Sequence, residues 1–534
     1  MIRYLILIGI VMVIGILLNK IFSKIPVPSL LIFIFLGMCF GENGIVGIEF
    51  NDYNISETIC STGLIVIMFY GGFGTNLNSA KNITVQASFL ATFGVLFTAI
   101  LTMLFCHYIL ELSYIEGFLI GSVISSTDAA SVFNILRNQN LSLKYNTDSL
   151  LEMESGSNDP ASYMLTVISC ALLTSSDISI MSLLFKQIFF GTLIGIAIGK
   201  IAVYMLNNFA FGEEHEKTVL VLAIAILSYA LTTILGGNGY LSVYLTGIYM
   251  GNKRIAHKRY LVHFFDVMTD ISQLLIFFVL GLLVTPVDLP KVFIPAVMIM
   301  LFMTIIARPL VVYGILIPFK SKNEQMAVVS FSGLRGVASI CFAIYAIMRG
   351  VNQTYDLFNL VFCVVLLSIS IQGTLLPIYC RKLNMIDKNS DIRRTFNEYQ
   401  EESDVNFTRI HIGENHGYKG EKIKNLKSLE GLLVAMIIRD NNTLIPNGET
   451  VIRKDDILVI AGREFLEQEH IILKEKEIGS KHKWCNKKLS ELKLPENTLI
   501  IMIQKPHNDI IPTGNTVIEK NDIIVIAETK ESIY

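Results

Sequence analysis

The sequence is poor in charge. Only 16% of its 534 residues are Asp, Glu, Lys or Arg, whereas soluble domains usually carry about 25%. In contrast, 52% of the residues are hydrophobic and the mean hydropathy is +0.55. Residues 1–380 form nearly continuous apolar blocks, and residues 383–534 are polar and strand-like. A single soluble domain is therefore excluded, and a membrane part followed by a soluble tail is predicted.

Several other signals are absent. The net charge of −2 leaves no overall basic surface, so no nucleic-acid partner is expected. The eight cysteines form no CxxC pair and the nine histidines show no ligand spacing, which argues against a disulfide framework or a zinc site. No G-x-S-x-G motif is present, and no G-x-G-x-x-G follows a strand in the tail. We therefore predict no enzyme, no resident cofactor and no NAD-binding domain.

Thirteen apolar segments between residues 3 and 380 are candidate membrane spans. The first lacks a convincing cleavage site and a second apolar block follows closely, so we interpret it as a span rather than a signal peptide. One set of alternate short loops carries fourteen lysines and arginines, and the other set carries four. Because cytoplasmic loops carry the positive excess, the N-terminus is predicted outside and the tail in the cytoplasm. An odd number of spans gives the same arrangement.

Polar residues interrupt the fifth candidate span, residues 115–137. Thr127 and Asp128 lie near its middle, where an ionised carboxylate costs at least about 2.5–3.5 kcal/mol. Asp128 either makes a hydrogen bond that packs helices together, or lies in a loop rather than in a span, or is a ligand of an ion. Ser125 and Ser126 could replace backbone hydrogen bonds where the helix unwinds.

The sixth candidate span contains the polar stretch LEMESGSNDP, residues 151–160. Ser155 and Asp159 are four residues apart and share one face of a helix. Asn158 could hold the Asp159 side chain, and Pro160 weakens the helix locally. These oxygen ligands suit an alkali cation, and a buried carboxylate can hold either a proton or a cation. That dual capacity is the minimum required for exchange.

The twelfth candidate span places Arg335 between Gly333 and Gly336, which permit a break in the helix. A buried arginine must find an acid or a set of carbonyl groups. Glu154 is the expected partner, either as a fold-stabilising salt bridge or as a moving part. Arg308 is similar but precedes a proline, so we place it near an interface. Polar breaks in two spans seven apart are typical of an inverted-repeat transporter with a site at the bilayer midplane.

Three segments carry a family resemblance: SSTDAASVF, LEMESGSNDPASYMLT and GLRGVASICFA, at residues 125–133, 151–166 and 333–343. They resemble the signature segments of the monovalent cation:proton antiporter family, in its NhaP-type branch. The resemblance covers the domain 1–382. It implies a polytopic α-helical fold of about thirteen spans with inverted repeats and broken helices, a homodimer, elevator-type alternating access, and electroneutral exchange of protons for Na⁺ or K⁺.

The resemblance also implies site residues. The residues expected to bind ions and protons are Asp159, Asp128, Thr127, Ser155 and Asn158. The alkali cation is expected at Asp159, Ser155 and Thr127. Glu154 and Arg335 are expected to form a structural ion pair. The third span departs from the family, because Tyr70 in IMFYGGFGT stands where relatives often carry an acid. A phenol is neutral at physiological pH and a poorer ligand. Tyr70 is therefore a candidate contributor only, and the sequence does not fix the choice between Na⁺ and K⁺.

The tail contains an internal repeat with an offset of 66 residues. Gly413 matches Gly479 and Asp456 matches Asp522, and the matching is free of gaps. Each copy is predicted to have a helix-like Lys/Leu segment before β-rich runs. We predict a linker at 383–410 and domains at 411–468 and 477–534. Both resemble the small α/β RCK-C (TrkA-C-like) regulatory domain, which implies pairing and, in several transporters, a small ligand such as cyclic di-AMP. Dimerisation alone remains the alternative.

The leading interpretation is a secondary antiporter that exchanges protons for K⁺ or Na⁺ across a bacterial-type cell membrane. The alternatives are a ligand-gated cation channel and a membrane-anchored ligand sensor. The absence of a filter-like loop between spans argues against a channel. The intact Asp128 and Asp159 argue against a sensor.

Overall fold

The structure is a computed structural model of the whole chain. The residues that it describes are 9, 13–15, 17, 29–42, 44–50, 52–75, 83–128, 131–132, 135–136, 141, 143–174, 179–209, 214–253, 255, 258–351, 353–386, 405–414, 416–426, 433–439, 442–463, 471–478, 483–492, 494, 498–505, 508–510, 512–520 and 522–529. The chain forms two compact units, Met1–Arg393 and Arg394–Tyr534.

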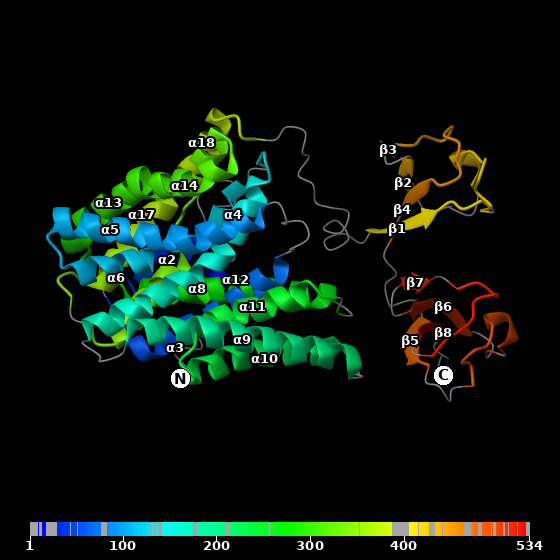
Figure 1. Ribbon diagram of the computed structural model, residues 1–534, viewed down its shortest axis with the longest axis horizontal. Coiled ribbons are helices and arrows are strands. Elements are labelled where there is room, and N and C mark those ends of the chain that lie inside the picture. Colours follow the sequence, from blue (N-terminus) through cyan, green and yellow to red (C-terminus); the bar gives the residue numbers. More distant parts are fainter. Residues whose placement is uncertain are drawn as a thin grey trace. The chain divides into compact units, whose positions relative to one another are not determined.

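The first unit is helical (Figure 1). Its described helices are α2 Ser29–Phe40, α3 Tyr53–Gly74, α4 Thr84–Phe89, α5 Val95–Leu110, α6 Tyr114–Ile124, α8 Thr147–Leu173, α9 Ile180–Asn208, α10 Glu214–Ile234, α11 Gly239–Gly251, α12 Lys258–Leu283, α13 Leu289–Phe302, α14 Arg308–Leu316, α15 Asn323–Phe331, α16 Val337–Met348, α17 Leu357–Leu367 and α18 Gly373–Lys382. Among the described residues, seven helical segments are long and apolar enough to cross a membrane, and three shorter apolar helices accompany them. The predicted multi-pass helical membrane part is confirmed at this level. Most of the first predicted span, residues 3–19, lies outside the described residues.

Small residues allow some of these helices to pack closely. A Cβ atom at Gly247 or Gly251 of α11 would overlap the main chain of Phe69 or Phe73 in α3. Close approach through small residues is the usual way that membrane helices associate, because lipid removes the hydrophobic driving force between them. In Figure 1, α9, α10 and α11 run side by side as three adjacent rods.

Among the described residues, two membrane helices are interrupted and three helical segments contain π-helical turns. The helix α6 ends at Ile124 and is followed by the non-helical stretch 125–128, and α15 and α16 are separated by residues 332–336. These breaks confirm the predicted interruptions at SSTD and GLRG. The π-helical turns are η1 Leu90–Gly94, η2 Met303–Ala307 and η4 Ser368–Gln372. Such turns often mark functional sites.

The second unit contains two four-stranded antiparallel sheets. The strands of the first are β1 Val405–His411, β2 Leu433–Arg439, β3 Asn442–Leu444 and β4 Ile457–Arg463, and those of the second are β5 Ile471–Glu477, β6 Thr498–Lys505, β7 Asn508–Ile510 and β8 Ile523–Thr529. The strand orders are β1-β4-β2-β3 and β5-β8-β6-β7. A register shift lies between Val434 and Met436, and its equivalent between Ile500 and Met502. The two copies therefore share one fold at the predicted offset.

The domain bounds of the tail differ from the sequence prediction. The strands β1 and β5 begin at residues 405 and 471, before the predicted domain starts of 411 and 477. The repeat does not reveal these two strands, because their sequences VNFTRIH and IILKEKE share no identical position. The strands are identified by their pairing with β4 and β8. Within the described residues, the predicted helix-like Lys/Leu segments contain the short 3₁₀ turns η5 Ile423–Asn425 and η7 Leu489–Glu491, and the rest of each segment lies partly outside the described residues.

Candidate functional site

The two helix breaks meet in the core of the first unit. The main-chain N–H of Asp128 donates to the carbonyl of Leu334 at 2.8 Å. The Arg335 guanidinium donates from Nη1 to the carbonyls of Ser125 and Ser126, at 2.8 and 2.9 Å. Backbone groups that lose their intrahelical partners at a break must be satisfied in this way at membrane depth. The two breaks therefore stabilise each other.

Charges at the crossing match the ends of the broken helices. Arg335 lies at the C-terminal end of α6, where unpaired carbonyls carry partial negative charge. The Asp128 carboxylate accepts from the main-chain N–H of Ser131 at 3.2 Å and from its hydroxyl at 2.6 Å, as a helix N-cap does. It also lies against Gly336, the residue that precedes α16, where a Cβ atom would overlap the carboxylate. Arg335 thus compensates the partial negative charge at the C-terminal end of α6, and the Asp128 carboxylate lies at the N-terminal end of α16.

The polar turn of α8 packs against the first break. The Asn158 amide donates to the Thr127 hydroxyl at 2.6 Å, and the Ser155 hydroxyl donates to the main-chain carbonyl of Thr127. The Asp159 carboxylate accepts a hydrogen bond from the Ser126 hydroxyl. Asp159 is 6% exposed. Four of the residues named from sequence, Thr127, Ser155, Asn158 and Asp159, are therefore brought together.

Asp159 has no cationic partner among the residues that the structure describes. In the described part of the chain, no Lys, Arg or His nitrogen lies within salt-bridge distance of its carboxylate. A buried carboxylate is costly unless it is paired or neutralised. A proton or a bound alkali cation would supply that neutralisation. The Ser126 hydroxyl contacts the carboxylate, and Ser155 and Asn158 of the same turn of α8 are hydrogen-bonded to Thr127. The arrangement fits a site that holds one or the other.

The ion pair of Glu154 corrects the sequence prediction. Its Oε1 atom pairs with Nη2 of Arg308, not with Arg335, and the two side chains are 1% and 3% exposed. The Arg308 side chain also lies against Gly333 in the second break. The prediction chose the wrong arginine because it assumed that Arg335 needs an acid, whereas carbonyl groups satisfy it.

Two π-helical turns adjoin these arginines. The turn η2 ends directly before Arg308, and η4 begins at Ser368, whose hydroxyl oxygen accepts from the Arg335 main-chain N–H at 3.2 Å. The side-chain Oε1 atom of Gln372 in turn accepts a hydrogen bond from the Ser368 hydroxyl. Both arginines are thus supported by helices that depart from regular α geometry.

Tyr70 makes a contact in another direction. Its hydroxyl donates to Oδ1 of Asp266 in α12 at 2.9 Å. Asp266 belongs to an exposed part of that helix. The Tyr70 phenol therefore forms a hydrogen bond with a carboxylate of the neighbouring helix α12.

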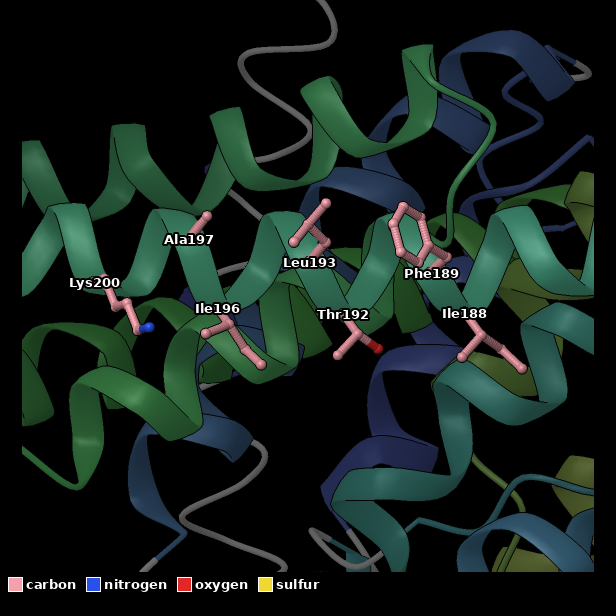
Figure 2. Close-up of a pocket in the computed structure, with 7 residues that line it drawn as sticks. All are labelled: Ile188, Phe189, Thr192, Leu193, Ile196, Ala197 and Lys200. Atoms are coloured by element: carbon pink, nitrogen blue, oxygen red, sulfur yellow. The ribbon is translucent and has the colours of Figure 1, made fainter.

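A separate apolar groove runs along α9 (Figure 2). It has a volume of about 510 Å³, and the residues that line it are Ile188, Phe189, Thr192, Leu193, Ile196, Ala197 and Lys200. None of the residues of the crossing lines this groove. Its walls come from one exposed helix face, which suits contact with lipid or with another membrane protein.

Two residues have roles in the structure that differ from those predicted from the sequence. Ser126 was considered only as a backbone substitute, yet its hydroxyl contacts Asp159. Its position one residue before Thr127 was the available signal. The proline after Arg308 suggests a position near an interface, yet Arg308 is 3% exposed and follows directly after the π-helical turn η2 within the helical segment Leu289–Phe319.

Comparisons with known proteins agree with this geometry. Residues 8–382 match the sodium/hydrogen exchanger transmembrane family, and residues 407–464 and 474–534 match the TrkA-C domain. The K(+)/H(+) antiporter NhaP2 of Shewanella sp. (strain ANA-3) is 36% identical over 459 residues, which cover 84% of this chain and 79% of that protein. The K(+)/H(+) antiporter NhaP of Alkalimonas amylolytica is 36% identical over 369 residues, which cover 68% of this chain and 64% of that protein.

A solved structure shares the fold of the first unit. The sodium proton antiporter MjNhaP1 from Methanocaldococcus jannaschii, at pH 8, superposes with a TM-score of 0.64 at 23% identity, and the match covers 72% of this chain and 99% of that one. The family match extends over more than half of the sequence and includes both helix breaks and the polar turn of α8. The chain therefore belongs to the sodium/hydrogen exchanger family, and its tail matches the TrkA-C domain over two stretches.

Proposed function

We propose that this protein is a secondary active antiporter that exchanges protons for K⁺ or Na⁺ by alternating access. The observation that carries the proposal is Asp159, a buried carboxylate without a cationic partner in the described part of the chain, held by a serine hydroxyl at the crossing of two broken helices. A carboxylate in that setting is neutralised by a proton or by a cation. Competition between the two couples their movements.

The proposed cation ligands are the Asp159 carboxylate, the Ser155 hydroxyl and Thr127. Asn158 orients the group through its hydrogen bond to Thr127. Asp128 already accepts two hydrogen bonds from Ser131 and compensates a helix end, so in this proposal it shapes the site electrostatically and Asp159 alone exchanges its proton. One exchanging carboxylate corresponds to one proton for one monovalent cation, which is electroneutral transport.

The favoured cation is K⁺. Relatives named K(+)/H(+) antiporters are 36% identical to this chain, whereas the Na(+)/H(+) antiporter 1 of Methanocaldococcus jannaschii is 27% identical over 355 residues.

The proposed membrane arrangement has thirteen spans, with the N-terminus outside and the tail in the cytoplasm of a bacterial-type cell. The excess of Lys and Arg in one set of loops supports this orientation. A homodimer belongs to the same proposal, and the exposed apolar face of α9 is one surface that a second copy could cover. Light scattering of the detergent-solubilised protein measures the mass that decides this point.

The tail is proposed to regulate transport. Two TrkA-C domains have no evident part in moving ions, and a small cytoplasmic ligand such as cyclic di-AMP could act through them. A ligand changes transport only if it binds one transport state better than the other. A differential of about 1–3 kcal/mol changes activity about 5- to 150-fold.

Proteoliposomes test the transport proposal. An antiporter moves K⁺ only when protons move the other way, and an imposed voltage does not change the electroneutral rate. A channel would instead pass K⁺ current under voltage alone, and an anchored sensor would move no ions. Either of those results would overturn the proposal.

A further inference from the structure

One buried amide joins the cation-site helix to two neighbouring helices. Asn238 precedes α11 and is 1% exposed. Its main-chain N–H donates to the Gln187 carbonyl of α9 at 3.2 Å, and its Oδ1 accepts from the Leu241 N–H at 3.0 Å, which caps α11. Its Nδ2 donates to the main-chain carbonyl of Pro160 in α8 at 2.8 Å. The side chain is therefore fixed at both ends.

The carbonyl that Asn238 contacts belongs to the residue directly after Asp159. Pro160 has no N–H, so the helix lacks the hydrogen bond that would normally return to Gly156. A turn that has lost one of its own hydrogen bonds depends more strongly on contacts from outside the helix. The Asn238 amide makes such a contact at this turn.

Two further contacts join the same face of α8 to α11. The hydroxyls of Ser157 and Tyr244 lie 2.8 Å apart, and the rings of Tyr163 and Tyr240 meet edge to face with centroids 4.9 Å apart. Ser157, Pro160 and Tyr163 are spaced by three residues, which places them along one stripe of the helix. The bond from Asn238 is thus the middle contact of three.

We propose that Asn238 is a positioning residue for the cation site. By holding the Pro160 carbonyl, it fixes the turn of α8 that carries Asp159, and so keeps that carboxylate in reach of Ser155 and Thr127. The inference rests on the proposed role of Asp159 as the cation and proton carrier. Asn238 itself does not touch the cation.

The substitution Asn238→Ser tests this role. Serine keeps a short oxygen acceptor that caps α11, but it has no amide to reach Pro160. The matched control is Asn252→Ala at the other end of α11, where the Asn252 amide donates to the Thr75 carbonyl at 2.8 Å. That bond resembles the one from Asn238 but does not involve α8.

In proteoliposomes, Asn238→Ser is expected to raise the KM for K⁺ about 3- to 18-fold. This range is the equilibrium factor that corresponds to the average and the largest free energy of one hydrogen bond between membrane helices. The maximal rate stays at the wild-type level, and Asn252→Ala leaves the KM unchanged. A lower melting temperature with an unchanged KM would show that Asn238 contributes only to the stability of the fold, and this result would overturn the inference.

Hydrogen exchange separates this inference from the transport proposal. In the detergent-solubilised full chain, amides of residues 161–166 should exchange faster in Asn238→Ser, by a similar factor, and at the wild-type rate in Asn252→Ala. If the wild type exchanged no ions, the proposed function would fail, while faster amide exchange would still bear out the positioning of α8. Unchanged amide exchange in Asn238→Ser would overturn the positioning itself.

Discussion

The buried pair of Glu154 and Arg308 yields the sharpest stability prediction. Removing one partner of a buried pair leaves an uncompensated charge, which costs about 3–5 kcal/mol. Both side chains are almost fully buried, with 1% and 3% exposure, so solvent gives little relief. We therefore expect Glu154→Leu and Arg308→Met each to lower the free energy of unfolding by that amount.

The double variant is the decisive measurement. Replacing both members of a buried pair by apolar residues of similar volume is often neutral or stabilising. Glu154→Leu with Arg308→Met should therefore recover most of the loss. Glu154→Leu with Arg335→Met should recover none, because Arg335 donates to carbonyls of Ser125 and Ser126 rather than to Glu154.

The assay is a titration of the purified protein with SDS in mixed micelles, followed by helical circular dichroism. Each double variant is compared with the sum of its two single variants. Strictly additive losses for Glu154 and Arg308 would refute their pairing. Recovery with Arg335 would instead restore the partner that the sequence suggested.

Three further outcomes are expected. Arg335→Ala should fold poorly as well as fail to transport, since two charge-assisted hydrogen bonds worth about 1.5–3 kcal/mol each are lost; a normal melting temperature would contradict this. Burial alone would raise the pKa of Asp456, but hydrogen bonds, chiefly from Arg439, hold that pKa below its usual value. The ionised Asp456 carboxylate therefore stabilises the first tail domain fully above the unfolded pKa of about 3.9, and this stabilisation is lost as the pH falls through the lower folded pKa. Proteolysis should show the domain losing stability in that pH range, and less steeply in Asp456→Asn. Truncation near Asn389 should abolish any response of transport to cyclic di-AMP, and identical responses of the full and truncated chains would exclude regulation by the tail.

The sequence predicted much of this site because its chemistry is local. The polar turn from Ser155 to Asp159 and the break at Thr127 stand out against apolar flanks, and helical spacing alone places the turn on one face. Which residues distant in the sequence pair with each other was harder to predict. Glu154 and Arg308 are 154 residues apart, and nothing in either segment says which of two arginines faces the acid. That choice depends on how the two breaks cross.

Contacts made through the main chain were the least predictable. Arg335 binds carbonyls and Asn238 binds the carbonyl of Pro160, and every residue offers a carbonyl. Sequence patterns therefore cannot identify the partner. The same reason applies to β1 of the tail, which pairs with β4 through main-chain hydrogen bonds although its side chains differ from those of β5.

The central claim is that Asp159 carries both the proton and the cation. Asp159→Asn keeps the size of the side chain and can still interact with Ser126, but it removes the group that gains and loses a proton. The most direct measurement is K⁺-driven proton movement in proteoliposomes that contain equal amounts of folded wild-type or variant protein. The account predicts that the variant shows no exchange at any pH. Exchange at the wild-type rate would contradict it.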